Sequence, residues 1–352
     1  MKHTTTSSSH TTASSRATRL APPLIFGIYP GGGAGTVGPG GQLQPEDPGQ
    51  RLSALSLLRP SSGQFVLRLY AEYTGPAGTS AAAQAEPEIV QYSAAGFQTE
   101  LVLRYRPAEE DPAAAVPGFV EFVRAAVHQL GANPNLVSLQ VTNEANVPGA
   151  PDAADGAYAG AENALVRGVE AAKAEIERGG YRQLRVGFNW AYQLGASETL
   201  FWRQLAELGG PAFVAALDWV GVDAYPGTWG PPLPAGDLAS AVRTATVDTL
   251  DTLRNTYMPL AGIPLTVPIN FCESGYPTGP GRTPEQQSTV LEAAVRTVSS
   301  ERAVYGVSGY RWFDLRDANS SSTSFEDKYG LMTDAYVPKP AFAVYRALVA
   351  QL

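Results

Sequence analysis

Strand-like and helix-like segments alternate eight times along this chain of 352 residues. The strand-like runs are short and rich in β-branched and aromatic residues, a composition that favours extended structure. They are Leu24–Tyr29, Phe65–Tyr70, Glu100–Tyr105, Leu136–Thr142, Leu184–Trp190, Leu217–Ala224, Leu265–Cys272 and Val307–Phe313. Regular alternation of this kind predicts a parallel sheet whose strands are joined by helical crossovers.

The segments between these runs carry apolar residues at helical spacing. In Gly118–Leu130, for example, Phe119, Phe122 and Val123 begin one apolar face. The expected helices are Arg51–Leu58, Glu88–Ala95, Gly118–Leu130, Ala161–Arg178, Glu198–Leu208, Leu238–Tyr257, Pro284–Ser299 and Pro340–Leu352. Eight strand–helix units predict an α/β chain that forms a single closed (β/α)8 TIM barrel, with an open doubly wound sheet as the alternative.

The loops support the barrel and indicate where its site lies. Segments after the predicted strands are mostly long, such as Ala145–Gly160, whereas segments after helices are short, such as Gly131–Asn135. Barrel enzymes carry their sites on the loops at the C-terminal ends of the strands. We expect one catalytic barrel over residues 23–352, preceded by a disordered Ser/Thr-rich tail over residues 1–22.

Composition and charge exclude several classes of function. A net charge of −8 argues against a nucleic-acid partner. The chain has no apolar run of membrane-spanning length, and its N-terminus lacks the apolar core of a signal peptide, so we expect no membrane partner and a cytoplasmic location. Cys272 is the only cysteine, which excludes an intramolecular disulfide and thiolate zinc clusters. The oligomeric state is left open.

Two segments resemble ligand motifs but are poor matches. Gly33–Gly38 fits the dinucleotide pattern G-x-G-x-x-G, yet Pro39, Pro45 and Pro48 oppose the helix that this site requires. We expect a Gly/Pro-rich loop over the barrel mouth instead. Asp152 and Asp155 lack the regular surroundings of a calcium loop. We therefore expect no cofactor and no metal.

Two glutamates end strand-like runs at positions that face each other across a barrel mouth. Glu144 follows the fourth run and Glu273 ends the seventh. Two facing carboxyl groups suit the cleavage of a glycosidic bond, because one protonates the leaving oxygen while the other attacks the anomeric carbon or activates water. The alternative is that both are surface carboxylates at the beginnings of loops.

The segments Thr142–Asn146 and Glu273–Tyr276, with Trp312 on the eighth run, resemble clan A of the retaining glycoside hydrolases. The resemblance implies cleavage of a β-linked glycoside by double displacement. It makes Glu144 the general acid/base and Glu273 the nucleophile. The implied partner is a β-glycoside or an oligo- or polysaccharide.

The same resemblance suggests roles for neighbouring residues. Asn143 matches the clan's asparagine that contacts the sugar 2-hydroxyl, and Tyr225 would donate a hydrogen bond to Glu273. Arg68 resembles an arginine beneath the nucleophile, with a barrel-wall salt bridge as its alternative role, and Arg104 is a weaker candidate of this kind. Three further candidates are the aromatic rings of Trp190, Trp229 and Trp312, whose flat faces suit the C–H faces of a pyranose.

Two other functions fit a barrel of this kind. A carbohydrate-binding barrel without catalysis would typically lack one carboxylate, and both are present here. A lyase or isomerase would normally need a metal or a phosphate-binding loop after the last strands. The loop Ser274–Arg282 contains glycines but has no clear phosphate-binding pattern.

Overall fold

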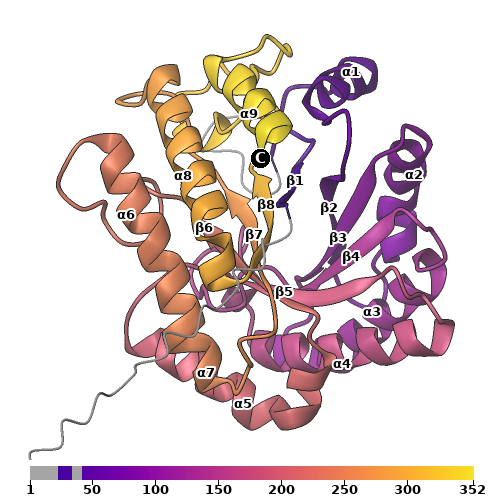
Figure 1. The fold of residues 1–352 in the computed structure, drawn as a ribbon. Coiled ribbons are helices and arrows are strands. Elements are labelled where there is room, and N and C mark those ends of the chain that lie inside the picture. Colours follow the sequence, from indigo (N-terminus) through magenta and orange to yellow (C-terminus); the bar gives the residue numbers. More distant parts are fainter. Residues whose placement is uncertain (1–22, 34–41) are drawn as a thin grey trace, which may run out of the picture.

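The computed structural model describes residues 23–33 and 42–352. Eight parallel strands form a closed barrel in which each strand pairs with the next along the chain and β8 pairs with β1 (Figure 1). The strands are β1 Ile25–Ile28, β2 Phe65–Tyr73, β3 Gln98–Tyr105, β4 Leu136–Val141, β5 Arg185–Ala191, β6 Trp219–Ala224, β7 Ile269–Ser274 and β8 Val307–Trp312. The predicted (β/α)8 barrel is therefore confirmed. The predicted tail over residues 1–22 and most of the Gly33–Gly38 motif lie outside the described residues.

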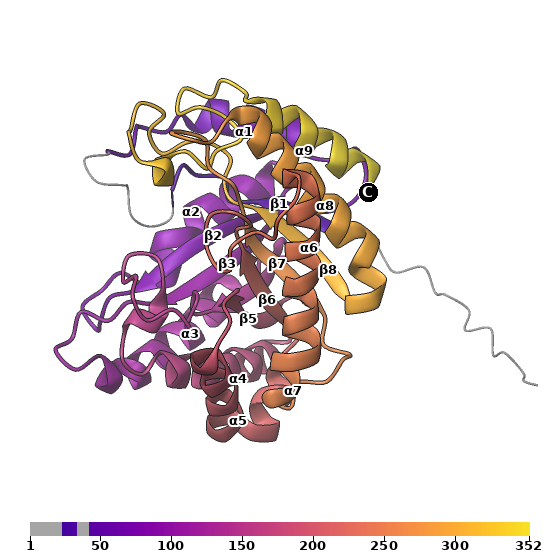
Figure 2. The same cartoon turned by 90° about the vertical axis from the view of Figure 1, so that its left-hand side faces the viewer.

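Helices surround the barrel, and Figures 1 and 2 show them packed around its outer wall. They are α1 Pro48–Leu58, α2 Ala81–Ala94, α3 Val116–Leu130, α4 Ala161–Gly179, α5 Ala196–Ala216, α6 Leu238–Asp251, α7 Met258–Leu260, α8 Pro284–Tyr305 and α9 Pro340–Gln351. Of these, α6 continues through a π-helical turn, η3 Thr252–Tyr257, into α7. Short 3-10 turns occur at η1 Pro112–Ala115, η2 Asp155–Ala157 and η4 Phe325–Asp327.

Local sequence fixes the ends of the helices. The longest helix, α8, begins at a capping box in which Thr283 and Gln286 each bond the other's backbone N–H, and Pro284 occupies its first position. The same helix ends at Gly306, whose φ of 67° is the left-handed conformation that glycine adopts without strain. The chain then enters β8 directly.

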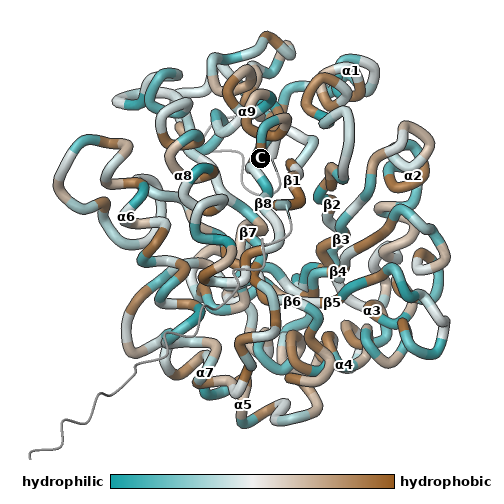
Figure 3. The backbone as a smooth tube through the Cα atoms, in the orientation of Figure 1, coloured by the Kyte–Doolittle hydropathy of each residue, from teal (hydrophilic) through white to brown (hydrophobic). Residues whose placement is uncertain are grey.

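The barrel wall separates an apolar layer from a polar interior. Side chains alternate along each strand, so one set points toward the helices and the other into the barrel. Phe188 and Trp190 of β5 belong to the buried apolar layer, which includes the brown stretches on α1, α4 and α9 in Figure 3. Inside the barrel, the buried Arg68 guanidinium donates to the buried side chains of Glu100 and Gln140.

Three predicted boundaries are wrong for identifiable reasons. The seventh strand begins at Ile269, because Leu265 is 69% exposed and the chain turns with Val267 bonded to Pro264. Helix α2 already begins at Ala81, capped by Ser80, and continues through Pro87. Helix α5 extends to Ala216 across a kink at Gly210, where φ is 52°.

No helix within the described ranges combines the length and the apolar character that crossing a bilayer requires.

Candidate active site

A pocket of about 350 Å³ opens at the C-terminal ends of the strands. Its floor contains the side chains that the loop asymmetry and the strand ends predict, namely Asn143, Glu144, Tyr225 and Glu273. They come from β4, β6 and β7 or from the residues just after them. The closed barrel thus brings together residues that are far apart in the sequence.

Glu273 lies at the centre of a ring of hydrogen-bond donors. Its Oε1 accepts from the Tyr70 hydroxyl at 2.6 Å and from Arg68 Nη2 at 3.1 Å. Its Oε2 accepts from the Tyr225 hydroxyl at 2.6 Å. Three donors, one of them a guanidinium, stabilise a negative charge on this carboxyl group.

Arg68 links Glu273 to the barrel interior. Its guanidinium is fully buried and also donates to Glu100 at 2.9 Å and to Gln140 at 2.8 Å. The two roles considered for Arg68, a contact with the nucleophile and a barrel-wall salt bridge, are therefore both present in one network. A buried guanidinium held by several acceptors offers a fixed positive charge beneath Glu273.

Glu144 has a different environment. Among the described residues, none donates a hydrogen bond to its carboxyl group, whereas its backbone N–H donates to Asn189 Oδ1 at 2.9 Å. Burial and the nearby charge of Glu273 raise the pKa of Glu144 to about 8, against smaller opposing effects of Arg104 and Arg68. This side chain therefore holds a proton at neutral pH.

The backbone that presents Glu144 is strained. Thr142 has a φ of 63° and Glu144 a φ of 48°, both in the left-handed region that residues with a side chain seldom adopt. Thr142 is β-branched, for which this conformation is an outlier. Strain of this kind persists only where the surrounding contacts hold it, and it concentrates at functional sites.

Asp223 adds a third carboxyl group to the pocket floor. One carboxyl oxygen from each of Glu144, Asp223 and Glu273 lies within 4.8 Å of the others. Asp223 Oδ2 accepts from Asn189 Nδ2, while its buried Oδ1 has no donor among the described residues. Burial and the charges of Glu273 and Glu144 raise the pKa of Asp223 well above its usual range.

These three carboxyl groups are close enough to share a cation. Both oxygens of Glu273, however, already accept hydrogen bonds from Arg68, Tyr70 and Tyr225. The donor set around Glu273 is therefore that of a carboxylate paired with a guanidinium, not that of a metal ligand.

Asn143 is fixed by bonds at both ends of its amide group. Its Oδ1 accepts from Asn189 at 3.0 Å and from Arg68 at 3.3 Å, and its Nδ2 donates to the carbonyl of Ala153 at 2.9 Å. Asn143 therefore connects Arg68, which contacts Glu273, to the loop after β4. The structure places it in the pocket lining beside Glu144.

Asp155 anchors the loop that follows Glu144. Its fully buried carboxylate accepts from the backbone N–H groups of Tyr105 at 2.7 Å and Asn143 at 2.8 Å, and from Arg104 Nε at 3.1 Å. The role of Arg104 is thus to hold this loop, and it does not contact Glu273. The oxygens of Asp155 face protein donors, in agreement with the absence of a calcium-loop pattern in the sequence.

Two of the predicted tryptophans lie outside the pocket, which corrects their expected contact with a sugar. Trp190 is fully buried behind β5, where its Nε1 donates to Glu198 at 2.7 Å and its ring packs against Trp202. Trp312 is also fully buried in the apolar layer. The reason is strand alternation, since the neighbours Asn189 and Phe313 point the other way.

Phe313 takes the place predicted for Trp312. It lines the pocket and stacks on Tyr29 with ring centroids 5.4 Å apart and an interplanar angle of 9°. Trp229 does border the pocket, where its ring is 51% exposed and its Nε1 donates to the Tyr329 hydroxyl at 2.6 Å. This loop tryptophan is therefore both anchored and accessible.

Sequence reasoning missed several other residues of the site. Tyr70 stands two positions after Arg68, so the two-residue period of a strand could have placed both on one face. Asn189 precedes Trp190 by one position, and the same period would have pointed it into the barrel. The involvement of Tyr329, by contrast, depends on a long loop with no periodic signal.

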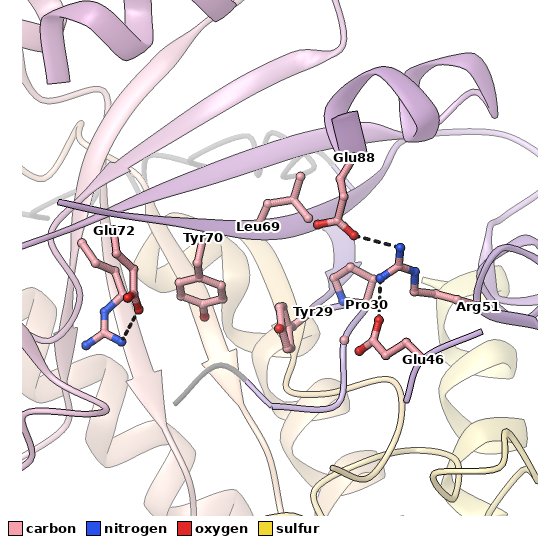
Figure 4. Close-up of a pocket in the computed structure, with 10 residues that line it drawn as sticks. Tyr29, Pro30, Glu46, Arg51, Leu69, Tyr70, Glu72 and Glu88 are labelled. Atoms are coloured by element: carbon pink, nitrogen blue, oxygen red, sulfur yellow. Dashed lines mark hydrogen bonds and ion pairs between the residues drawn. The ribbon is translucent and has the colours of Figure 1, made fainter. Parts of the chain in front are cut away.

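A second pocket of about 200 Å³ adjoins the first at Tyr70 and lies between the ends of β1 and β2. Figure 4 shows Tyr70 and Tyr29 between Glu72 on one side and Arg51 on the other. Arg51 pairs with Glu46 at 2.6 Å and with Glu88 at 2.8 Å. The charged side chains in the walls of this pocket thus already pair with each other.

Comparison by sequence finds no matching family model and no matching relative among curated proteins. Comparison of structures finds many with the same fold. A β-D-glucuronidase from Dictyoglomus thermophilum aligns with a TM-score of 0.56 and 14% identity, over 86% of this chain and 46% of that one. Fungal β-1,4-galactanases align with a TM-score of 0.59 and 13% identity, over 87% of this chain and 94% of theirs.

A β-1,3-glucanosyltransferase from Rhizomucor miehei, solved as an active-site mutant with laminaritriose, aligns with a TM-score of 0.54 and 15% identity. That match covers 90% of this chain and 96% of the transferase. The chain therefore spans less than half of the glucuronidase but nearly the whole length of the other two proteins. At these identities the likeness establishes a shared fold, that of a (β/α)8 barrel.

Proposed function

We propose that this protein is a retaining β-glycoside hydrolase of the clan A type, with Glu144 as general acid/base and Glu273 as nucleophile. The observation that carries the proposal is the contrast between these two side chains. Glu273 accepts three hydrogen bonds, one of them from a guanidinium, whereas Glu144 accepts none from the described side chains and has its pKa raised to about 8. When the environments of two carboxyl groups differ in this way, the protonated one suits the role of acid and the one surrounded by donors suits that of nucleophile.

The spacing of the carboxyl groups supports retention of configuration. In retaining enzymes the two groups are about 5–5.5 Å apart, whereas inverting enzymes leave about 6.5–9.5 Å for a water molecule. Carboxyl oxygens of Glu144 and Glu273 lie within 4.8 Å of each other. This separation is on the scale of a retaining pair and supports direct attack by Glu273.

The proposed reaction has two steps. First, the Glu144 carboxyl proton passes to the glycosidic oxygen while a Glu273 carboxylate oxygen bonds to the anomeric carbon, and the aglycone leaves as an alcohol. Second, Glu144, now a carboxylate, takes a proton from water as the water oxygen displaces Glu273 from that carbon. Neither step calls for a metal or an organic cofactor.

The charge of Glu273 couples the two steps. Its negative charge helps to keep Glu144 protonated before the first step, because two adjacent carboxylates disfavour each other. Formation of the glycosyl ester removes that charge. The pKa of Glu144 then falls, which turns the same side chain into a base for the second step.

The carbohydrate partner is part of the proposal. The structural neighbours described above are named for a glucuronidase, galactanases and a glucanosyltransferase, all of which act on carbohydrates. The exposed ring of Trp229 and the ring of Phe313 in the pocket offer apolar faces of the kind that pyranose rings pack on.

The test is turnover of a panel of 4-nitrophenyl β-glycosides by the wild type, Glu144→Gln and Glu273→Gln. We expect Glu273→Gln to lose activity to background. Glu144→Gln should lose little on these activated substrates but about 10²–10⁴-fold on alkyl β-glycosides, whose poor leaving groups need protonation. Glu292→Gln, on the exposed face of α8, is the matched control and should be unaffected. Sugar binding without turnover in the wild type would instead establish a non-catalytic carbohydrate-binding barrel.

A further inference from the structure

The pocket changes character on the side of Glu144. Beyond the carboxyl groups, the wall consists of Val147, Ala150 and Ala153 from the loop after β4 and of Ala191 at the end of β5. On the opposite side, Tyr70, Asp223 and Tyr225 surround Glu273 with hydroxyl and carboxyl groups. The floor around the carboxyl groups is thus polar, and the wall next to Glu144 is lined by methyl groups.

Polar groups near this wall are already engaged within the protein. Asn146 donates to the Ala191 carbonyl and to Glu198, each at 3.0 Å, and accepts from the Ala191 N–H at 3.0 Å. The Tyr192 hydroxyl bonds to Thr249 and Thr252. Among the described residues of the wall, this leaves Gln193 as the polar side chain available to a ligand.

The wall is also held in place. Asp155 fastens the loop to Tyr105, Asn143 and Arg104, and the Ala153 carbonyl accepts from Asn143. At the start of the loop, the Val147 N–H bonds to the Glu144 carbonyl at 3.0 Å. A fixed apolar surface does not turn to offer hydrogen bonds to sugar hydroxyls, and burying a hydroxyl without a partner is costly.

The general acid protonates the oxygen of the leaving group, so the aglycone lies on the side of Glu144. We infer, on the basis of the proposed function, that the substrates are β-glycosides whose aglycone is an apolar group, alkyl or aryl, and not a second sugar. The glycone binds over the polar floor, and the aglycone packs against Val147, Ala150, Ala153 and Ala191. The surface that selects the substrate is therefore the loop after β4.

A homologous series of alkyl glycosides tests this inference. Methyl, ethyl, n-propyl and n-butyl β-glycosides of the sugar identified by the turnover panel have leaving groups of similar basicity but increasing apolar area. We expect kcat/KM to rise about two- to fourfold per methylene, as burial of a CH₂ group predicts. The β-linked disaccharide of the same sugar should react more slowly than the butyl glycoside.

Val147→Thr sharpens the test, because threonine keeps the shape of valine and adds a hydroxyl group. We expect this variant to lower the butyl-to-methyl ratio of kcat/KM about threefold or more, whatever its effect on the rate with the methyl glycoside. Val337→Thr makes the same substitution at an exposed position outside the pocket and serves as the control. An unchanged ratio in Val147→Thr would exclude this wall as the aglycone surface.

The outcomes separate this inference from the function on which it rests. If the enzyme turns over the alkyl glycosides but kcat/KM does not rise with chain length, or if it prefers the disaccharide, the apolar aglycone is overturned. The proposed glycosidase function would still hold. Absence of turnover with every glycoside would overturn the proposed function and this inference together. If kcat/KM rises with alkyl chain length in the wild type and Val147→Thr reduces that rise, both the glycosidase function and the apolar aglycone are established.

Discussion

At the scale of single residues, environment gives two glutamates opposite properties. Burial and the charge of Glu273 raise the pKa of Glu144 to about 8, whereas three hydrogen-bond donors surround the carboxyl group of Glu273. A sequence identifies the residue types but not this difference, which depends on Tyr70 and Arg68 of β2 reaching across the barrel to β7. The different surroundings of the two side chains, on which their proposed roles rest, thus depend on closure of the sheet.

The raised pKa of Glu144 predicts a specific dependence of activity and stability on pH. Its pKa is raised from 4.5 to about 8, so the folded protein binds this proton more tightly than the unfolded chain does. The free energy of unfolding therefore decreases as pH rises from about 4.5 to about 8. kcat/KM should also fall above pH of about 8, as the acid is lost.

Glu144→Gln removes this titration. Thermal unfolding of the wild type and of Glu144→Gln should differ most above pH 8, where the variant is relatively more stable. The two proteins should show their smallest difference near pH 4. Parallel curves of Tm against pH would show that Glu144 has an ordinary pKa and would contradict its assignment as the acid.

Asp223 is expected to be neutral in the resting site, because its buried Oδ1 has no donor and two carboxyl groups lie close by. Asp223→Asn is the neutral isostere and keeps an acceptor for Asn189. We expect its free energy of unfolding to lie within about 1 kcal/mol of the wild-type value, whereas Asp223→Leu removes one acceptor of the buried Asn189 amide at a cost of about 1–3 kcal/mol. Urea denaturation measures both; equal losses in the two variants would argue for an ionised Asp223.

The residue scale also shows where sequence reasoning ends. Asn143, Glu144, Tyr225 and Glu273 could be predicted, because each follows from a strand end and from a short resemblance. Trp190 and Trp312 were predicted at the correct ends of strands but on the wrong side of the wall. A shift of one residue reverses the direction of a side chain, and the boundaries of a strand are seldom known that closely from sequence.

At the scale of elements, the loop after β4 is as much a part of the site as the strand before it. Asp155 is fully buried and holds this loop against β3 through Arg104 and two backbone N–H groups. The length of the loop could be read from the sequence, but its anchor could not, since Asp152 and Asp155 look alike there. Burial distinguishes the two aspartates.

Removal of this anchor should be costly. Asp155→Ala leaves the buried Arg104 Nε and two backbone N–H groups without their acceptor, and we expect a loss of about 3–5 kcal/mol in the free energy of unfolding. Asp152→Ala, on the same loop with a side chain 60% exposed, is the matched control and should change stability by less than about 1 kcal/mol. Equal effects of the two substitutions in urea denaturation would refute the anchoring role.

Elements with a strong periodic pattern could be predicted from the sequence, and those set by tertiary contacts could not. The fold class followed from eight alternations, and α3 and α4 lie close to their predicted ranges. Leu265–Pro268 resembled a strand because it is apolar and β-branched, yet it forms a turn before β7. Propensity over four residues does not decide between these two structures.

At the scale of the whole molecule, barrel closure produces the arrangement on which the account depends. β4 and β7 are not neighbouring strands in the barrel, but closure of the sheet brings Glu144 and Glu273 to the same pocket. The same closure places Arg68 and Tyr70 of β2 beneath Glu273. An open sheet built from the same strands would separate these groups.

The central claim is that Glu273 forms a covalent bond with the sugar. Activated 2-deoxy-2-fluoro β-glycosides of the sugar that the turnover panel identifies should inactivate the enzyme and add the mass of one fluoroglycosyl group. Peptide mass spectrometry should then locate that group on Glu273, and Glu273→Gln should remain unlabelled. Labelling of Glu144 or Asp223 instead, or turnover of these compounds with inversion and no covalent adduct, would contradict the account.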